Sequence, residues 1–83
     1  MDTAVAFGLV LRRLRLAAGL TQEQLGLDAD LRRTYVSILE LGQQQPSLGT
    51  ILKLATALSV SGATLIEHVE KERARPGKGR QRV

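Results

Sequence analysis

The stretch Thr21 to Glu40, TQEQLGLDADLRRTYVSILE, predicts two short helices joined by a tight turn. Thr21 and Gln24 form the Thr-x-x-Gln pattern of a capping box, in which each side chain satisfies a backbone donor that the helix start leaves unpaired. The residues that share an apolar face of the first helix are Leu25, Gly26 and Ala29. Because glycine costs roughly 1 kcal/mol of helix propensity against alanine, its presence predicts that another helix passes close to Gly26.

The second helix, expected from about Arg33 to Leu41, has two unlike sides when its residues are placed at about 100° per step. One side is suited to a core and holds Val36, Leu39 and Glu40. The other side combines a basic group, two hydroxyls and two aliphatic groups, contributed by Arg33, Thr34, Ser37, Ile38 and Leu41. A helix that reads bases needs such a side, because it offers donors to base edges and apolar groups to a thymine methyl.

Three segments resemble a known family. They are GLTQEQL from Gly19, RRTYVSILELG from Arg32 and PSLGTILKLATAL from Pro46, and they are similar to the Xre-type, lambda-repressor-like helix-turn-helix family. The resemblance covers about residues 7–69, and the RTYVS run and its continuation are also similar to the small controller proteins of restriction–modification systems. It implies an all-α fold, a compact five-helix lambda-repressor-like DNA-binding domain with a helix-turn-helix.

The composition is that of one small domain. At 83 residues it buries a smaller share of its surface than larger domains do, so its stability is expected to be marginal or helped by association. There are no cysteines, which excludes a disulfide framework and a cysteine metal site. No apolar run approaches the roughly 18 residues of a membrane span and no signal peptide is visible, so we expect a cytoplasmic protein with no membrane partner.

The net charge of +4 is unevenly distributed. Residues 71–83 hold six basic residues and one acidic residue, a net +5, whereas residues 1–70 hold six basic and seven acidic residues, a net −1. The expected organisation is a helix-turn-helix domain over residues 1–72 and a basic disordered tail over residues 73–83. The tail therefore supplies most of the positive field that would attract nucleic acid.

A first helix is expected from Thr3 to Ala18, capped by Asp2 or Thr3 and stopped by Gly19. Its apolar stripe is Phe7, Leu11, Leu14 and Ala18. Among its arginines, Arg12 and Arg13 are expected on a solvated face. The family resemblance implies a different role for Arg15, namely an ion pair with Glu40, whose lone carboxylate would be costly on the core side of its helix.

The start of the second helix of the motif has two possible forms. Related sequences usually have glycine where Asp30 stands and a capping Ser or Thr where Arg32 stands. Aspartate tolerates the left-handed conformation better than most residues, but arginine cannot cap a helix. Either Asp30 caps a helix that begins two residues earlier, or the helix start frays.

Two further helices complete the domain. Gly42 ends the second helix of the motif, and the polar loop Gln43–Gln45 follows. Ser47 is expected to cap a fourth helix whose core stripe is Leu48, Ile51, Ala55 and Leu58. Ser61 is expected to cap a fifth, from about Gly62 to Arg73, that carries Leu65, Ile66 and Val69.

The motif places the candidate DNA contacts on and around its second helix. By the resemblance, Gln22 lies near a phosphate, and Arg33, Thr34 and Ile38 occupy base-reading positions. The full predicted set is Gln22, Arg32, Arg33, Thr34, Ser37, Ile38, Gln43 and Gln44. The alternative for the helix is a plain polar exposed face, and for the glutamines a plain solvated loop.

Three apolar residues exceed what a five-helix core needs: Leu52, Ile66 and Val69. They either fill the edge of the core or form a dimer face. Operators read by this fold are usually two-fold, with half-sites about 34 Å apart. In addition, a domain this small with no effector domain needs a second copy to bind DNA tightly. We therefore predict a homodimer.

No catalytic residue, metal site or cofactor is predicted. His68 is the only histidine, and no Ser/His/Asp, paired-carboxylate or phosphate-loop pattern accompanies it, so a solvated surface histidine is expected. The expected function is a sequence-specific regulator on double-stranded DNA, either controller-like or antitoxin-like. The alternative is a protein-interaction module of the same fold that holds a protein partner, which apolar Ile38 and Leu41 on the base-reading side would favour.

Overall fold

The structure, a computed structural model, describes residues 1–75 and contains five helices and no strands within that range. The helices are α1 (Thr3–Ala17), α2 (Gln22–Ala29), α3 (Arg33–Glu40), α4 (Leu48–Ala57) and α5 (Gly62–Ala74). The all-α, five-helix prediction is confirmed. Every N-terminal helix end except that of α3 is capped by a side chain, and the caps are Asp2, Thr21, Ser47 and Ser61.

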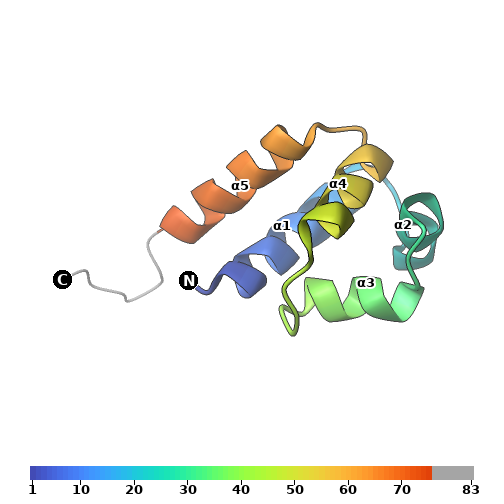
Figure 1. Cartoon of the computed structure of the whole chain (residues 1–83), viewed down its shortest axis with the longest axis horizontal. Coiled ribbons are helices and arrows are strands. Elements are labelled where there is room, and N and C mark those ends of the chain that lie inside the picture. The colour runs from blue at the N-terminus through green and yellow to red at the C-terminus, as the bar shows by residue number, and fades with distance from the viewer. Residues whose placement is uncertain (76–83) are drawn as a thin grey trace.

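Helix α1 lies at the centre of the arrangement, between α5 on one side and α3 on the other (Figure 1). Helix α4 contacts both α2 and α5, and α2 contacts α3 across their turn. The core therefore lies where α1 and α4 meet the inner faces of the other three helices. This arrangement leaves the opposite side of α3 free to face solvent.

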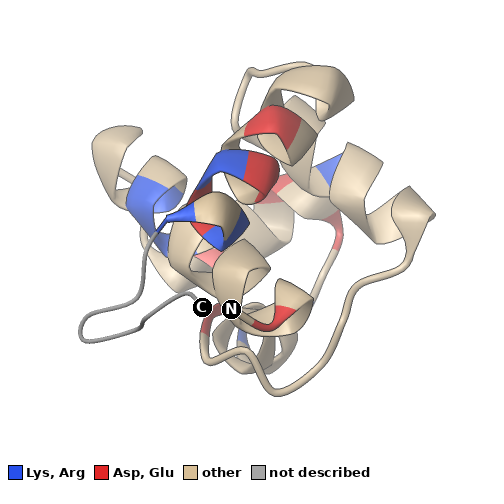
Figure 2. Cartoon of the chain, turned by 90° about the vertical axis from the view of Figure 1, so that its left-hand side faces the viewer, with Lys and Arg blue, Asp and Glu red and all other residues tan. Residues whose placement is uncertain are grey.

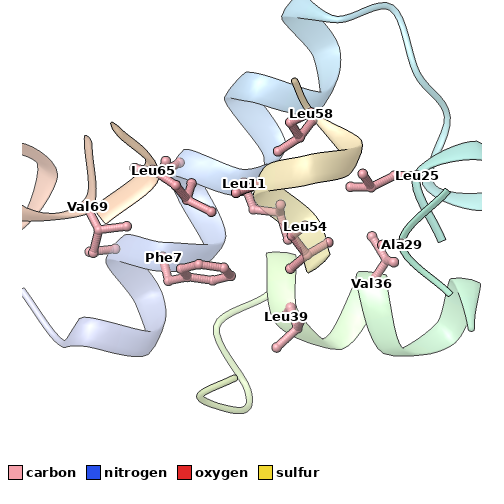
Figure 3. Packing of buried hydrophobic residues seen from close by; sticks show 13 residues of the cluster. Phe7, Leu11, Leu25, Ala29, Val36, Leu39, Leu54, Leu58, Leu65 and Val69 are labelled. Carbon is pink, nitrogen blue, oxygen red and sulfur yellow. The ribbon is translucent and has the colours of Figure 1, made fainter. Parts of the chain in front are cut away.

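Leu54 of α4 is completely buried and lies between Leu11 and Leu39 (Figure 3). It was not among the residues that we expected in the core stripe of α4. Leu48 was expected there but is 69% exposed, and Ile51 is half-buried. The expected stripe is therefore wrong at Leu48. The side of α4 that faces the core is instead the one with Leu54 and Ala55, continued by Leu58 at its end.

The C-terminal ends of α1 and α5 differ slightly from expectation. Helix α1 stops one residue early, so Ala18 is an exposed cap residue and not part of the core stripe. Helix α5 extends one residue beyond its expected end at about Arg73, so Arg73 and Ala74, which fall within the expected tail of residues 73–83, are helical. The remainder of the predicted tail, from residue 76 on, lies outside the described residues.

Glycine 8 allows α1 to pack directly against the end of α3. A Cβ atom at Gly8 would lie 2.5 Å from the carbonyl oxygen of Leu39 and 2.6 Å from that of Glu40. Gly42, just beyond α3, has φ of +73° and lies against Val5, where a Cβ would be 2.9 Å from the Val5 Cα. These two glycines bring the last turn of α3 into backbone contact with α1.

The buried carboxylate of Glu72 joins α5 to α1 through an ion pair. Glu72 is only 4% exposed, and its Oε1 accepts from Nη2 of Arg13 at 2.8 Å. Nη1 of Arg75 lies 3.3 Å from the same carboxylate. Arg13 was expected on a solvated face, and although its side chain is 52% exposed, it is the ionic partner of a core group. This pair joins residues 59 positions apart in the chain.

Residues 1–75 carry nine basic and eight acidic residues, so the described part is close to neutral. Figure 2 shows Lys and Arg interspersed with Asp and Glu over the helices rather than gathered on one side. Contacts with phosphate in this part therefore depend on individual groups and on the helix ends.

Candidate nucleic-acid interface

The two helices of the motif are joined by a turn with defined hydrogen bonds. The capping box of α2 is complete: the Gln24 backbone N–H donates to Oγ1 of Thr21 at 3.0 Å, and the Thr21 N–H donates to Oε1 of Gln24 at 2.8 Å. Asp30 ends α2 in the left-handed conformation, with φ of 59° and ψ of 47°. The aspartate thus adopts a conformation that glycine takes most readily and that aspartate tolerates better than most residues.

Gly26 is buried, but the group that approaches it belongs to the turn and not to another helix. A Cβ atom there would lie 2.7 Å from the Leu31 carbonyl oxygen, and the Leu31 N–H donates to the Gly26 carbonyl at 2.7 Å. Our expectation of a passing helix was therefore wrong in the identity of the neighbour. The glycine lets the turn fold back on α2, and this sets where α3 begins.

Helix α3 begins without a side-chain cap. Its N-cap residue is Arg32, which makes no capping hydrogen bond, and the first helical residue is Arg33. The possibility that Asp30 caps an earlier helix start is wrong, because Asp30 serves α2. The free N–H groups at the start of α3 and the two adjacent guanidinium groups together form an anion-attracting end.

The two sides of α3 are separated as the helical wheel predicts. Val36 and Leu39 are completely buried against the core. On the opposite side, Arg33 and Thr34 are exposed, whereas Ser37 and Ile38 are half-buried. Leu41, one residue beyond the helix, is 65% exposed. The side chains at the N-terminal half of α3 thus protrude most.

Arg15 and Glu40 lie in contact inside the domain. Arg15 Nε is 2.6 Å from Oε2 of Glu40 and Nη2 is 3.0 Å from Oε1, while Nη1 donates to the Leu20 carbonyl at 2.9 Å. Their side chains are 9% and 4% exposed, respectively. The hydrogen bond to the Glu40 carboxylate raises the pKa of the Arg15 guanidinium, and this outweighs the opposing effect of burial. Arg15 therefore stays charged, and its contact with Glu40 joins α1 to α3.

Gln22 is the first residue of α2 and is half-buried. Its Nε2 donates to Oε1 of Glu40 at 3.0 Å. The family resemblance implies a place near a phosphate for Gln22. It does not indicate this contact, because the two residues are 18 positions apart. Gln22 thus lies between the buried ion pair and the motif surface.

A glycine-based motif ends α3 and starts the glutamine loop. The Gly42 N–H donates to the Leu39 carbonyl at 3.0 Å and the Gln43 N–H donates to that of Ile38 at 3.1 Å, which is the Schellman pattern. Gln43 and Gln44, like the following Gln45, are exposed. The glutamines therefore follow directly after the C-terminal end of α3.

The predicted dimer residues separate into two groups. Leu52 and Ile66 are 49% and 38% exposed and line a groove between α4 and α5 with a volume of about 480 Å³. Val69 is only 5% exposed and lies in the core near Phe7 (Figure 3), so its assignment to a dimer face was wrong. Leu48 also lines this α4–α5 groove, whereas helical spacing predicts it in the core stripe of α4.

Residues 1–75 do not meet the requirements of a metal site or of a single membrane-spanning helix. No set of three His, Cys, Asp or Glu side chains in this part of the chain is placed to hold a metal ion. His68 is half-buried rather than fully solvated. Among the same residues no single helix is long and apolar enough to cross a membrane. Helices α4 and α5 reach that length and composition only as a pair bent by 105°.

A short capped helix, a turn closed on a glycine and a second helix with one exposed polar side define a helix-turn-helix protein of the DNA-binding class. The chain belongs to the family described as the helix-turn-helix domain, whose model matches residues 6–69. The resemblance seen in the sequence is therefore confirmed.

Proteins named as controllers have similar sequences, and the crystal structure of one of them has a similar fold. Control protein C.BamHI of Bacillus amyloliquefaciens is 39% identical over 62 residues, which are 74% of this chain and 76% of that protein. Control protein C.MunI of a Mycoplasma species is 35% identical over 72 residues, 86% of this chain and 97% of that protein. The crystal structure of the restriction-modification controller protein C.AhdI from Aeromonas hydrophila has 50% identity and a TM-score of 0.72, with coverage of 75% and 94%.

These similarities identify the chain as a helix-turn-helix DNA-binding regulator that is similar to restriction–modification controller proteins. The family is one of transcriptional regulators and not of enzymes.

Proposed function

We propose that this protein acts as a homodimer that places two copies of α3 in successive major grooves of a pseudo-palindromic operator. The observation that carries the proposal is the exposed side of α3, which is held outward by the burial of Val36 and Leu39 and by the Arg15–Glu40 pair. For two copies to read one operator, their α3 helices must lie about one turn of DNA apart, about 34 Å.

Individual contacts follow from the placement of each side chain. Arg33 lies at the start of α3, where a guanidinium can make two parallel hydrogen bonds to guanine O6 and N7. Thr34 lies beside it, and Ile38 one turn further on offers only apolar contact, which favours a thymine methyl. Arg32, Ser37, Gln43 and Gln44 flank this set, and Gln22 meets the phosphate backbone from α2.

The α4–α5 groove is the proposed dimer interface. Its lining is mainly apolar and includes Leu48, Leu52 and Ile66, which are 69%, 49% and 38% exposed, and Glu67 and Glu70 of α5 also line it. Aliphatic side chains exposed next to one another are favourable to bury on association. Since the groove lies on α4 and α5, a second copy seated there leaves α3 of both copies uncovered.

The biological role that best fits is that of a controller. Two of the relatives are named control proteins and a third is a restriction-modification controller protein. We therefore favour a controller-like regulator over an antitoxin-like one. The gene neighbourhood provides a direct check, since a controller is expected beside genes for a nuclease and a methyltransferase.

The test of base reading is selection of bound duplexes from a random pool by the wild type and two variants. Arg33→Ala is expected to lose affinity and to relax the preference at one base pair in each half-site, at a cost of about 1–3 kcal/mol. Gln22→Ala is expected to weaken all sequences about equally. If the Arg33→Ala motif matches that of the wild type, α3 does not read bases through Arg33.

A second candidate function is supported by one feature of the same helix. Leu41 is 65% exposed and Ile38 is partly exposed next to the polar residues of α3. These aliphatic groups suit a protein-interaction module in which the fold holds a partner protein. If the wild type selects no motif from the random pool, this function replaces the first.

A further inference from the structure

The amide of Gln22 has a fixed orientation because of its partner. Glu40 is an ion-paired carboxylate that accepts hydrogen bonds from Nε and Nη2 of Arg15 at 2.6 and 3.0 Å. Such a carboxylate only accepts hydrogen bonds, so the Gln22 group that faces it at 3.0 Å must be the NH₂ and not the carbonyl. The side chain of Glu40 is 4% exposed, and this anchor is therefore shielded from competing water.

We infer that Glu40 is a positioning residue for DNA binding and that it acts through Gln22. The inference rests on the proposed function, in which the start of α2 meets a phosphate. The Gln22 NH₂ carries two N–H bonds, of which Glu40 takes one. The other is available to a phosphate oxygen, which is likewise an acceptor. Gln22 thereby joins a buried anion of the protein to an anion of the DNA backbone.

This contact couples three helices. Arg15 comes from α1, Gln22 from the start of α2 and Glu40 from the last turn of α3. A phosphate held by Gln22 is thus linked by hydrogen bonds to the end of the helix that reads bases. Glu40 fixes the phosphate contact and the reading helix relative to each other, which a purely structural ion pair between α1 and α3 would not do.

The chemistry of Gln22 is specific. A methionine at this position has similar length and no donor, so it tests the hydrogen bonds with little change in packing. A glutamate would bring a carboxylate next to both Glu40 and the phosphate, and like charges at such range repel. We expect Gln22→Met to weaken binding to operator and random duplex alike by about tenfold, the equivalent of one hydrogen bond to a charged group.

The decisive experiment is a double-mutant cycle on DNA affinity. Dissociation constants for operator and random duplexes are measured for the wild type, Gln22→Met, Glu40→Gln and the double variant, under conditions where circular dichroism shows each protein to be folded. The expected result is that Glu40→Gln loses affinity even when fully folded, and that the double variant is no weaker than the weaker single variant. A role of Glu40 in stability alone would shift the melting temperature and leave the affinity of the folded protein unchanged.

The Gln22→Glu variant retains Glu40 and provides a second test of the contact if Glu40→Gln does not fold. It is expected to melt at a lower temperature than Gln22→Met near neutral pH, because its carboxylate faces Glu40, and to recover as the pH is lowered toward about 4. Independent effects in the cycle, or equal melting temperatures of these two variants, would overturn the inference. If the wild type binds no duplex, the proposed function fails and this inference with it. If the wild type binds and Gln22→Met binds equally well, the inference fails together with the proposed phosphate contact of Gln22, while base reading by α3 stands.

Discussion

The guanidinium of Arg15 donates to the Glu40 carboxylate and to the Leu20 carbonyl, and the pair is almost completely buried. Removal of one partner leaves the other charge without compensation, which costs about 3–5 kcal/mol. Arg15→Ala and Glu40→Ala are each expected to lower the free energy of unfolding by this amount, and the double variant by less than the two added together. Thermal melts of the four proteins in the cycle measure the coupling, and strictly additive losses would contradict it.

At the scale of helices, the contact between α1 and α3 depends on Gly8. A methyl group at Gly8 would meet the Leu39 and Glu40 carbonyl oxygens at 2.5 and 2.6 Å, and neither backbone atom can move without shifting α3. Gly8→Ala is expected to destabilise the domain by about 1–3 kcal/mol and to weaken DNA binding, although alanine is the better helix former.

Gly49 provides the matched control for this prediction. It is also a helical glycine, but it is exposed, and a Cβ there would approach an Oγ of Ser47 no closer than 3.9 Å. Gly49→Ala is expected to stabilise by up to about 1 kcal/mol. Urea unfolding of both variants, with a gel shift on operator DNA, gives the comparison. Equal stability changes at the two sites would show that α1 and α3 are not in close contact.

The contact between α1 and α5 is expected to be sensitive to acid. The hydrogen bond from Arg13 lowers the pKa of Glu72 against the opposing effect of burial, and Arg75 adds to the lowering. A carboxylate with a depressed folded-state pKa stabilises the fold above its unfolded pKa, near 4.3, and this contribution is lost as the pH falls through the lower folded-state value.

Glu72→Gln is therefore expected to lose less stability than the wild type between about pH 7 and about pH 3. Glu67→Gln serves as the control, since the Glu67 side chain is 64% exposed and its partner Lys71 is 3.9 Å away. Melting temperatures across this pH range test the prediction. An identical acid dependence of Glu72→Gln and the wild type would contradict it.

At the scale of the whole molecule, neighbouring residues of α5 are expected to respond in opposite ways to a charge. Ile66→Glu is expected to give a folded monomer, because Ile66 lines the α4–α5 groove at 38% exposure. Leu65→Glu is expected to unfold the chain, and so is Val69→Glu, since these residues are 0% and 5% exposed. Sedimentation and circular dichroism separate the outcomes, and a dimeric Ile66→Glu protein that binds DNA normally would place the interface elsewhere.

The basic residues after α5 are expected to add affinity without specificity. Truncation after Arg75 keeps the Glu72 contact with Arg13 and removes Lys78, Arg80 and Arg82. The salt slope of DNA binding is expected to fall by about 0.9 for each of these cations that neutralises a phosphate. The ratio of operator to random affinity is expected to stay nearly constant. An unchanged slope in the truncated protein would contradict this role.

Features that depend on a few consecutive residues were predictable from the sequence. The capping box at Thr21 and Gln24, the caps at Ser47 and Ser61 and the stop at Gly42 each involve groups within about four residues, so the local chain contains both partners. The two sides of α3 follow from helical spacing for the same reason. These local signals determined the five helices and the position of the motif. The Arg15–Glu40 partnership came from family resemblance together with the cost of a lone buried carboxylate.

Tertiary structure decided what helical spacing leaves open. Helices α4 and α5 each have apolar arcs wider than the strip that the core can cover, so the pattern could not tell Leu54 from Leu48 or Val69 from Ile66. Glu72 is buried because Arg13, 59 positions away, lies opposite it once α5 packs on α1, and the contact of Gln22 with Glu40 exists only after the turn brings α2 and α3 together. The sequence thus determined which helices form, whereas the packing of each helix against partners distant in the chain decided which side chains became core, groove or contact.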